Sequence, residues 1–418
     1  MTKIILSINA GSSSVKISVY TTRHRELPKQ LAEAEISGLT APPAQLSYVR
    51  GDVQVFKNVP PPDGKIESQD DAFKAILDVL TGDRELPEIA TKSDISIACH
   101  RVVHGGDYQT AKVITQDTYD HLGKIADLAP LHNANSLRII KSCMDELPGA
   151  LNVAYFDSQF HATIPPHICT YPIDPEIARN NQLRKYGFHG ISYSFIVRSV
   201  ARFLGKDPAD LNIIALHLGS GASACAIRGG RSWDTSMGLT PLAGLPGATR
   251  SGSVDPSLVF HYASDVGKLS PSSTKELHIS VAEEILNKQG GWKALTGTTN
   301  FGEIAASVDA RPECRLAFDL FANRVCGYVG SYYVALGGRV DALVFAGGIG
   351  ERSDKLRAAV AGQVACLGFA VDPERNAAKV RDVVQDVGRR GAAHRTLVCL
   401  TDEQYEMARG CAENDELW

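Results

Sequence analysis

The chain lacks the cysteine patterns that mark a metal site or a set of disulfides. Its nine cysteines include no Cys-X-X-Cys pair, and an odd, scattered set is typical of free thiols in a reducing compartment. No apolar run approaches the length of a membrane span, and the N-terminus turns polar at Asn9, too early for a signal peptide. We therefore expect a soluble, cytoplasmic protein with no membrane partner.

An excess of charge of either sign is also missing. The 43 Lys and Arg residues nearly balance the 47 Asp and Glu residues, so the net charge is −4, and no long basic block occurs. This composition gives no reason to expect a nucleic acid partner. The 418 residues, of which 44% are hydrophobic, suffice for two or three globular domains with large cores.

The N-terminal stretch predicts a hairpin around which the rest of the chain is organised. An apolar, β-branched run over residues 4–8 enters a turn of small residues, 9–14, and returns as a second strand to residue 20. The turn offers unhindered backbone N–H groups and hydroxyls, and Lys16 follows it, which suits a phosphate. The Walker pattern GxxxxGK[ST] is absent, however, and an ordinary hairpin turn accounts for the stretch equally well.

The first half of the chain then alternates helices and strands. Weak alternation over 21–65 predicts further strands, and the spacing of apolar residues predicts a helix over 70–80. The remaining predicted elements are a strand over 95–99 that runs into Gly105 and Gly106, a helix over 133–147 and a strand over 151–156.

The second half repeats this order. It has a helix over 192–204, a strand over 213–218, a small-residue turn over 219–223, a returning strand over 224–227, and a strand over 342–346 that runs into a glycine-rich turn at 347–350. The repeat predicts two similar α/β domains that face each other, each with a mixed sheet. A last helix is expected from Thr401, with Thr401 and Gln404 as a capping box.

Nine stretches, in order, carry a resemblance to a known family. They read SINAGSSSVK, HRVVHGG, APLHNANSL, FDSQFH, YGFHGIS, HLGSGAS, DTSMGLTPLAGL, ATRSGSVDP and FAGGIGE, and they span nearly the whole chain. The chain resembles the acetate kinase family, within the acetate and sugar kinase/Hsp70/actin superfamily (ASKHA). The resemblance implies two facing RNase H-like domains, residues 1–157 with the C-terminal helix 404–418 packed on them and residues 158–403, with a nucleotide cleft between.

The resemblance also implies a reaction, acetate + ATP ⇌ acetyl phosphate + ADP, with Mg²⁺ or Mn²⁺ and a homodimeric enzyme. Two alternatives within enzymes are a propionate or butyrate kinase and a pyrophosphate-dependent acetate kinase. An alternative from another class is an Hsp70- or actin-like ATPase module, against which no peptide-binding domain follows the ATPase-like part.

Four residues are expected to carry the transfer. Arg101 and Arg250 supply planar, permanently charged donors, which suit a carboxylate or a transferring phosphoryl group. By resemblance His189 donates to the transition state, and it does not act as a base because phosphoryl transfer needs charge neutralisation more than proton transfer. Asp157 is expected to orient Arg101 or to support the metal.

The resemblance assigns the remaining site residues in three groups. The small apolar acyl pocket comprises Val103, Leu131, Phe188 and Pro241, with Arg101 at the carboxylate. The metal is associated with Asn9 and Glu403. The nucleotide and phosphate contacts are Ser14, Lys16, His132, His217, Gly219, Ser220, Gly221, Asn300, Gly347, Gly348, Ile349 and Gly350.

Three positions depart from the family's usual residues and bear on the phosphoryl donor. Ser220 stands where relatives have Asn, Gly302 where an Arg is expected near the adenosine, and Arg352 where relatives have Asn. Arg352 is a candidate to replace the missing nucleotide contact. The retained glycine run at 347–350 leaves room for a base, so ATP is favoured as donor over pyrophosphate.

Overall fold

The computed structural model describes residues 1–11, 13–39, 42–62, 66–125, 130–262, 268–271, 273 and 279–418, with 130–132, 134 and 262 described by backbone alone. The chain forms two compact units, Met1–Gln159 with Asp402–Trp418, and Phe160–Thr401. Within the described residues no helix has the length and apolarity needed to cross a bilayer.

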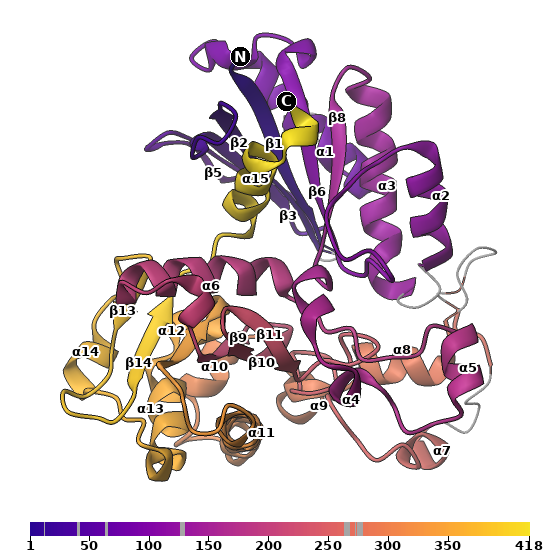
Figure 1. The fold of residues 1–418 in the computed structure, drawn as a ribbon. Coiled ribbons are helices and arrows are strands. Elements are labelled where there is room, and N and C mark those ends of the chain that lie inside the picture. Colours follow the sequence, from indigo (N-terminus) through magenta and orange to yellow (C-terminus); the bar gives the residue numbers. More distant parts are fainter. Residues whose placement is uncertain are drawn as a thin grey trace. The chain divides into compact units, whose positions relative to one another are not determined.

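The first unit is built on a mixed sheet (Figure 1). Its strand order is β5-β4-β3-β2-β1-β6-β8-β7, in which β1 pairs antiparallel with β2 and parallel with β6. The strands are β1 (Lys3–Ala10), β2 (Ser14–Thr22), β3 (Lys29–Ser37), β4 (Gln45–Arg50), β5 (Val53–Val59), β6 (Ile95–Val102), β7 (Lys112–Val113) and β8 (Leu151–Phe156).

Helices cover both faces of this sheet. Successive residues of β1 point to opposite faces, so both faces can be followed along this strand. Leu6 and Ile8 join the core cluster that contains Phe73 and Ile76 of the first helix. On the other face, the backbone carbonyl of Ser7 accepts a hydrogen bond from Gln404 Nε2 of the last helix at 3.1 Å. The helices are α1 (Gln69–Gly82), α2 (Gln116–Ile125), α3 (Pro130–Glu146) and α15 (Glu403–Glu413).

The second unit repeats the same topology. Its sheet has the order β11-β10-β9-β12-β14-β13, so its six strands correspond to β3-β2-β1-β6-β8-β7 of the first unit. Strand β9 pairs antiparallel with β10 and parallel with β12, as β1 does with β2 and β6. The strands are β9 (Ile213–Leu218), β10 (Ala222–Arg228), β11 (Arg231–Thr235), β12 (Ala342–Ala346), β13 (Val384–Asp386) and β14 (Arg395–Cys399).

The core of the second unit lies around one long helix, α11 (Pro312–Ala335), whose Phe318 and Phe321 join the cluster formed by Leu216 and Phe345 of the sheet. The other helices are α4 (Pro166–Cys169), α5 (Pro175–Asn180), α6 (Gly190–Leu204), α7 (Leu258–Tyr262), α8 (Val281–Lys288), α9 (Gly291–Thr296), α10 (Phe301–Ala306), α12 (Gly347–Arg352), α13 (Asp354–Gln363) and α14 (Pro373–Ala377).

The duplicated α/β fold with mixed sheets is confirmed, and three local predictions need correction. The helix expected from Asn133 begins at Pro130, because proline is well suited to the first helical turn. The glycine run 347–350 forms helix α12 and is not a turn. The capping box at Thr401 is wrong: Asp402 caps α15 by accepting from Tyr405 N, and Gln404 is turned to the sheet.

Candidate functional site

In the first unit, two parallel strands bring Arg101 and Asp157 together. Arg101 lies near the end of β6, and Asp157 directly follows the neighbouring strand β8. Arg101 donates from Nε to Asp157 Oδ1 at 3.1 Å and from Nη2 to Oδ2 at 2.7 Å. Asp157 is 1% exposed, so this paired geometry holds the guanidinium in one orientation.

Asn9 and Glu403 complete what we call the Arg101 cluster, which comprises Asn9, Arg101, Asp157 and Glu403. Asn9 accepts from Arg101 Nη1 and donates to Glu403 Oε2, each at 3.4 Å, and Arg101 Nε lies 3.5 Å from Glu403 Oε2. Burial lowers the pKa of Arg101, but the carboxylates of Asp157 and Glu403 raise it, and the net direction is upward. Arg101 is therefore a permanent cation at the carboxyl end of the sheet.

The donor set of this cluster fits a magnesium ion held mainly by a nucleotide. Both Asp157 oxygens are held by short hydrogen bonds from Arg101, whereas the amide oxygen of Asn9 accepts only one long bond, at 3.4 Å, so Glu403 and Asn9 are the better-placed oxygen donors. Mg²⁺ usually takes one or two protein carboxylates, several waters and the phosphates of its substrate. Within the described ranges no group of three or more His, Cys, Asp or Glu side chains is placed to hold a metal. The candidate protein carboxylate is Glu403, because the two oxygens of Asp157 are held by the paired hydrogen bonds from Arg101.

In the second unit, Arg250 and His189 both approach Gly221, at the end of the turn between β9 and β10. A Cβ atom on Gly221 would lie 3.0 Å from Nη1 of Arg250 and 3.7 Å from Nε2 of His189. The loop that carries Arg250 is fixed to the turn, because Ala248 N donates to the carbonyl of Ser220 at 2.8 Å. Two cationic or donor groups therefore converge on one point of a glycine-rich turn.

His189 is held in an unusual backbone conformation. It precedes the first residue of α6 with φ 61° and ψ 22°, in the left-handed region that few residues other than glycine adopt. Its Nδ1 lies 2.8 Å from the hydroxyl of Ser223, which lies 2.6 Å from the hydroxyl of Tyr193. The ring of His217 lies beside it, with centroids 4.3 Å apart, so His189 is fixed from two sides.

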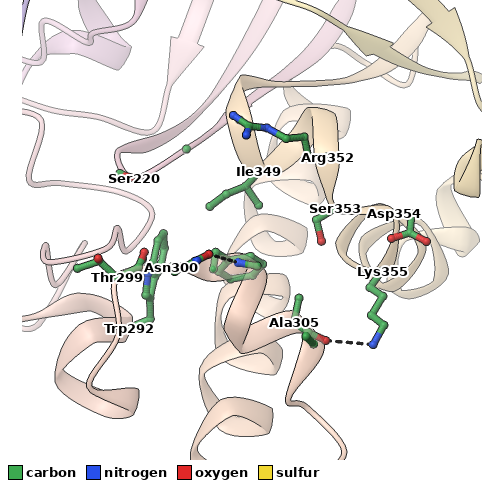
Figure 2. Close-up of a pocket in the computed structure, with 15 residues that line it drawn as sticks. Ser220, Trp292, Thr299, Asn300, Ala305, Ile349, Arg352, Ser353, Asp354 and Lys355 are labelled. Atoms are coloured by element: carbon green, nitrogen blue, oxygen red, sulfur yellow. Dashed lines mark hydrogen bonds between the residues drawn. The ribbon is translucent and has the colours of Figure 1, made fainter. Parts of the chain in front are cut away.

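Gly219 and Ser220 of the same turn line a cavity of about 520 Å³. Figure 2 shows Arg352 and Ile349 of α12 on one side and Trp292 and Asn300 opposite them. Lys355 ties these two sides together by donating to the carbonyl of Ala305 at 3.1 Å. The lining residues are Gly219, Ser220, Trp292, Thr299, Asn300, Phe301, Gly302, Ala305, Ala306, Gly348, Ile349, Arg352, Ser353, Asp354 and Lys355.

The cavity gathers part of the predicted nucleotide set, namely Gly219, Ser220, Asn300, Gly348 and Ile349. Gly347 and Gly350 are buried and do not line it. A side chain at Gly347 would meet the backbone of Leu218 at 2.8 Å, so close packing already requires glycine there. The Asn300 side chain caps α10, so its oxygen is already engaged by Gly302 N and Glu303 N.

Several other predicted residues have local roles. Lys16 lies on β2 and forms an ion pair with Glu33 at 2.8 Å. Ser14 closes the first hairpin, its carbonyl accepting from Gly11 N at 2.9 Å. Val103 is partly buried in the first unit, and Phe188 and Pro241 are buried in the second. The predicted acyl contact Leu131 and phosphate contact His132 lie on α3, outside the residues whose side chains are described.

The partners of His189 and most of the cavity wall were not predicted from the sequence. Alternation along β10 places Ser223 on the same face as Gly221, and Tyr193 follows His189 by one helical turn, so both were within reach of pattern reasoning. Trp292 and Phe301 carried no such signal, because they read as ordinary core residues and are indeed 3% and 4% exposed.

The duplicated fold combines a cavity with two side-chain donors, Arg250 and His189, at the turn 219–221, as phosphoryl transfer requires. A model of the Acetokinase family matches residues 4–409. A probable acetate kinase of Neurospora crassa is 61% identical over an alignment of 447 residues, which covers 100% of this chain and 95% of that protein. The chain belongs to the Acetokinase family.

Solved structures agree with this assignment. A propionate kinase from Francisella tularensis superposes with a TM-score of 0.82 at 31% identity, over 97% of this chain and 98% of that one. Acetate kinase from Porphyromonas gingivalis gives a TM-score of 0.80 at 29% identity, over 98% of each chain.

Proposed function

We propose that the enzyme transfers the γ-phosphoryl group of ATP directly to acetate, reversibly. An acetate oxygen attacks the γ-phosphorus as the bond to the ADP oxygen breaks, which gives acetyl phosphate and ADP without a covalent enzyme intermediate. Such a transfer needs positioning and charge neutralisation more than proton chemistry. Permanent cations and fixed hydrogen-bond donors are the groups that supply both.

The observation that carries this proposal is the position of the turn 219–221. Gly219 and Ser220 line the cavity, whereas Gly221 faces Arg250 and His189. A nucleotide in the cavity with its phosphates directed along the turn would bring its terminal phosphate to these two donors. This arrangement supports a nucleoside triphosphate as donor, because pyrophosphate would leave the cavity empty.

His189 acts as a hydrogen-bond donor in this proposal. We assign Tyr193 as the donor to Ser223 and Ser223 as the donor to His189 Nδ1, an order that places the ring proton on Nε2. That nitrogen is the one directed towards Gly221 and Arg250. Arg250 and His189 would then stabilise the charge that develops on the equatorial phosphoryl oxygens.

Arg101 is proposed to bind the acetate carboxylate and the transferring phosphoryl group, with Asp157 orienting it. Glu403 and Asn9 would hold Mg²⁺, directly or through water. When bound, the ion neutralises charge on the nucleotide phosphates. The side chain of Arg352 makes no hydrogen bond or ion pair with the described residues and lines the cavity, so we propose that it contacts the nucleotide. We propose that the small acyl pocket expected from Val103, Leu131, Phe188 and Pro241 favours acetate.

We also propose that the two compact units are the domains expected at 1–157 and 158–403, and that the enzyme is a cytoplasmic homodimer. The nine cysteines are free, which supports a reducing compartment. Light scattering coupled to size-exclusion chromatography tests the dimer, because a dimer has twice the 44.9 kDa mass of the chain.

Trapping of the acyl phosphate with hydroxylamine tests the reaction itself. The purified enzyme is assayed with ATP or pyrophosphate against acetate, propionate and butyrate, with and without Mg²⁺. We expect hydroxamate from acetate with ATP, a lower kcat/KM for propionate, and no product without the metal. One methylene is worth about 1–3 kcal/mol in an apolar pocket, so the acyl preference is graded. ATP hydrolysis that is independent of acetate would contradict the proposal.

A further inference from the structure

Arg357, on α13, is a buried cation whose hydrogen bonds all go to neutral groups. It is 2% exposed and is among the largest fully buried side chains of the described residues. Its Nη1 donates to the carbonyls of Gly350 and Glu351, both at 2.9 Å. Its Nε and Nη2 donate to the side-chain oxygen and the backbone carbonyl of Asn376, at 2.7 and 2.6 Å.

This arrangement is costly for the stability of the fold. Within the described part of the chain no carboxylate lies at ion-pair distance from Arg357, and burial lowers its pKa although Asp354 opposes this. A buried charge is expensive to desolvate, and apolar residues of similar volume often serve stability equally well. The guanidinium therefore calls for an explanation other than packing.

The carbonyls that Arg357 holds belong to the wall of the cavity. Gly350 and Glu351 lie in α12, which contributes Gly348, Ile349 and Arg352 to the lining. Asn376, the other partner of Arg357, donates to the carbonyl of Asp354 at 2.8 Å, and Asp354 lines the cavity too. Through these hydrogen bonds to backbone carbonyls, Arg357 and Asn376 together hold the segment 348–355 in place.

We infer that Arg357 is a positioning residue for the phosphoryl donor. By fixing the C-terminal end of α12, its planar fork sets the place of Gly348 and Arg352, two α12 residues that line the cavity. Arg352 Nη2 would lie 3.1 Å from a Cβ atom on Gly348, so a small shift of α12 changes this surface. The inference rests on the proposed function, because it takes the cavity as the nucleotide site.

The test compares Arg357→Met, Arg357→Lys and a matched control, Arg375→Met. Arg375 also donates to a backbone carbonyl, that of Gly388 at 2.8 Å, and pairs with Asp386, and it does not line the cavity. Each variant is checked by circular dichroism, and the KM for ATP, the KM for acetate and the Kd for ADP by calorimetry are measured. The calorimetric Kd does not depend on turnover.

We expect Arg357→Met to raise the KM for ATP and the Kd for ADP by about tenfold or more, because misplacement of a binding wall is costly. The KM for acetate should stay within about twofold. Arg357→Lys keeps the charge but loses the fork, and should fall between Met and wild type. If the Met variant does not fold, the Lys variant decides the question by the same comparison of the KM for ATP and the Kd for ADP with the KM for acetate.

An unchanged Kd for ADP in a folded Arg357 variant would overturn the inference, as would equal increases in both KM values. Equal effects of Arg375→Met would also overturn it. Failure of the proposed function looks different, because the wild-type enzyme itself would then bind no ADP or form no acyl phosphate.

Discussion

Gly221 and Arg250 are in such close contact that any side chain at position 221 would require the guanidinium to shift. A Cβ atom at position 221 would lie 3.0 Å from Arg250 Nη1, closer than most real contacts of that kind. The side of the turn that faces Arg250 is thus shaped by the absence of a side chain. This contact links a sequence feature, the glycine of HLGSGAS, to the placement of a proposed catalytic group.

Gly221→Ala should therefore displace Arg250 and reduce kcat by about 10- to 100-fold, since small misplacements of charged groups are costly in phosphoryl transfer. The hydroxamate assay measures this. Gly327→Ala on α11 is the control, because a Cβ there meets nothing within 4 Å. It should keep activity and add about 0.5–1 kcal/mol of stability through helix propensity. Full activity of Gly221→Ala would argue against a role for Arg250 at this turn.

Removal of either proposed catalytic arginine should reduce kcat far more. Arg101→Ala and Arg250→Ala are each expected to lower it by about 10³-fold or more, because a fixed charge-assisted donor is lost from the transition state. Arg202→Ala, which removes an exposed arginine in the last turn of α6, should leave activity unchanged. Near-normal turnover of a folded Arg101 or Arg250 variant would exclude that residue from catalysis.

The Arg101–Asp157 pair can be tested by an isosteric change. Asp157→Asn removes one of the two acceptors and the negative charge, so Arg101 loses its fixed orientation. We expect kcat to fall by about 10- to 1000-fold, less than for loss of Arg101 itself. Steady-state kinetics with saturating ATP and acetate measure the effect, and a variant as slow as Arg101→Ala would show that Asp157 does more than orient the arginine.

Glu403→Gln tests the metal site. The amide keeps the size of the side chain and can still accept from Asn9, but it is a poorer ligand for Mg²⁺. The Mg²⁺ concentration for half-maximal rate should rise by about tenfold, with little change in the KM for acetate. Glu413→Gln, at the exposed end of the same helix, is the matched control. Equal Mg²⁺ curves for the Glu403 variant and wild type would place the ion elsewhere.

Stability should depend on pH through a buried histidine. Burial lowers the pKa of His161 from 6.5 to about 4, opposed by its hydrogen bond to the carbonyl of Phe188. Between these values the unfolded state binds a proton that the folded state excludes. The contribution of His161 to the free energy of unfolding is therefore fully present above about pH 6.5. It falls by about 3 kcal/mol as the pH drops towards 4.

Urea unfolding of wild type and His161→Gln at pH 7.5, 6 and 5 isolates this contribution. Glutamine can keep a hydrogen bond to Phe188 but does not titrate, so the difference between the two proteins should shrink as the pH falls. Parallel pH profiles would show that His161 is not excluded from protonation in the folded state.

The repeated hairpins were predictable because local pattern carries them. The β-branched runs of β1 and β9, each followed by a small-residue turn, gave the strands within one or two residues. The C-terminal helix was less well predicted. Thr401 and Gln404 fit a capping pattern, but Gln404 finds better partners in the carbonyls of Ser7 and Lys16, which are remote in sequence.

The sequence by itself determined the duplicated α/β order, the family and the identity of the charged residues, because these follow from local pattern and from motifs in a fixed order. Only the tertiary structure decided which residues meet. Strand pairing set Asp157 against Arg101 and so decided between the two roles expected for Asp157, and folding of a distant loop set Arg250 against Gly221. Such contacts depend on long-range packing, which no short stretch of sequence specifies.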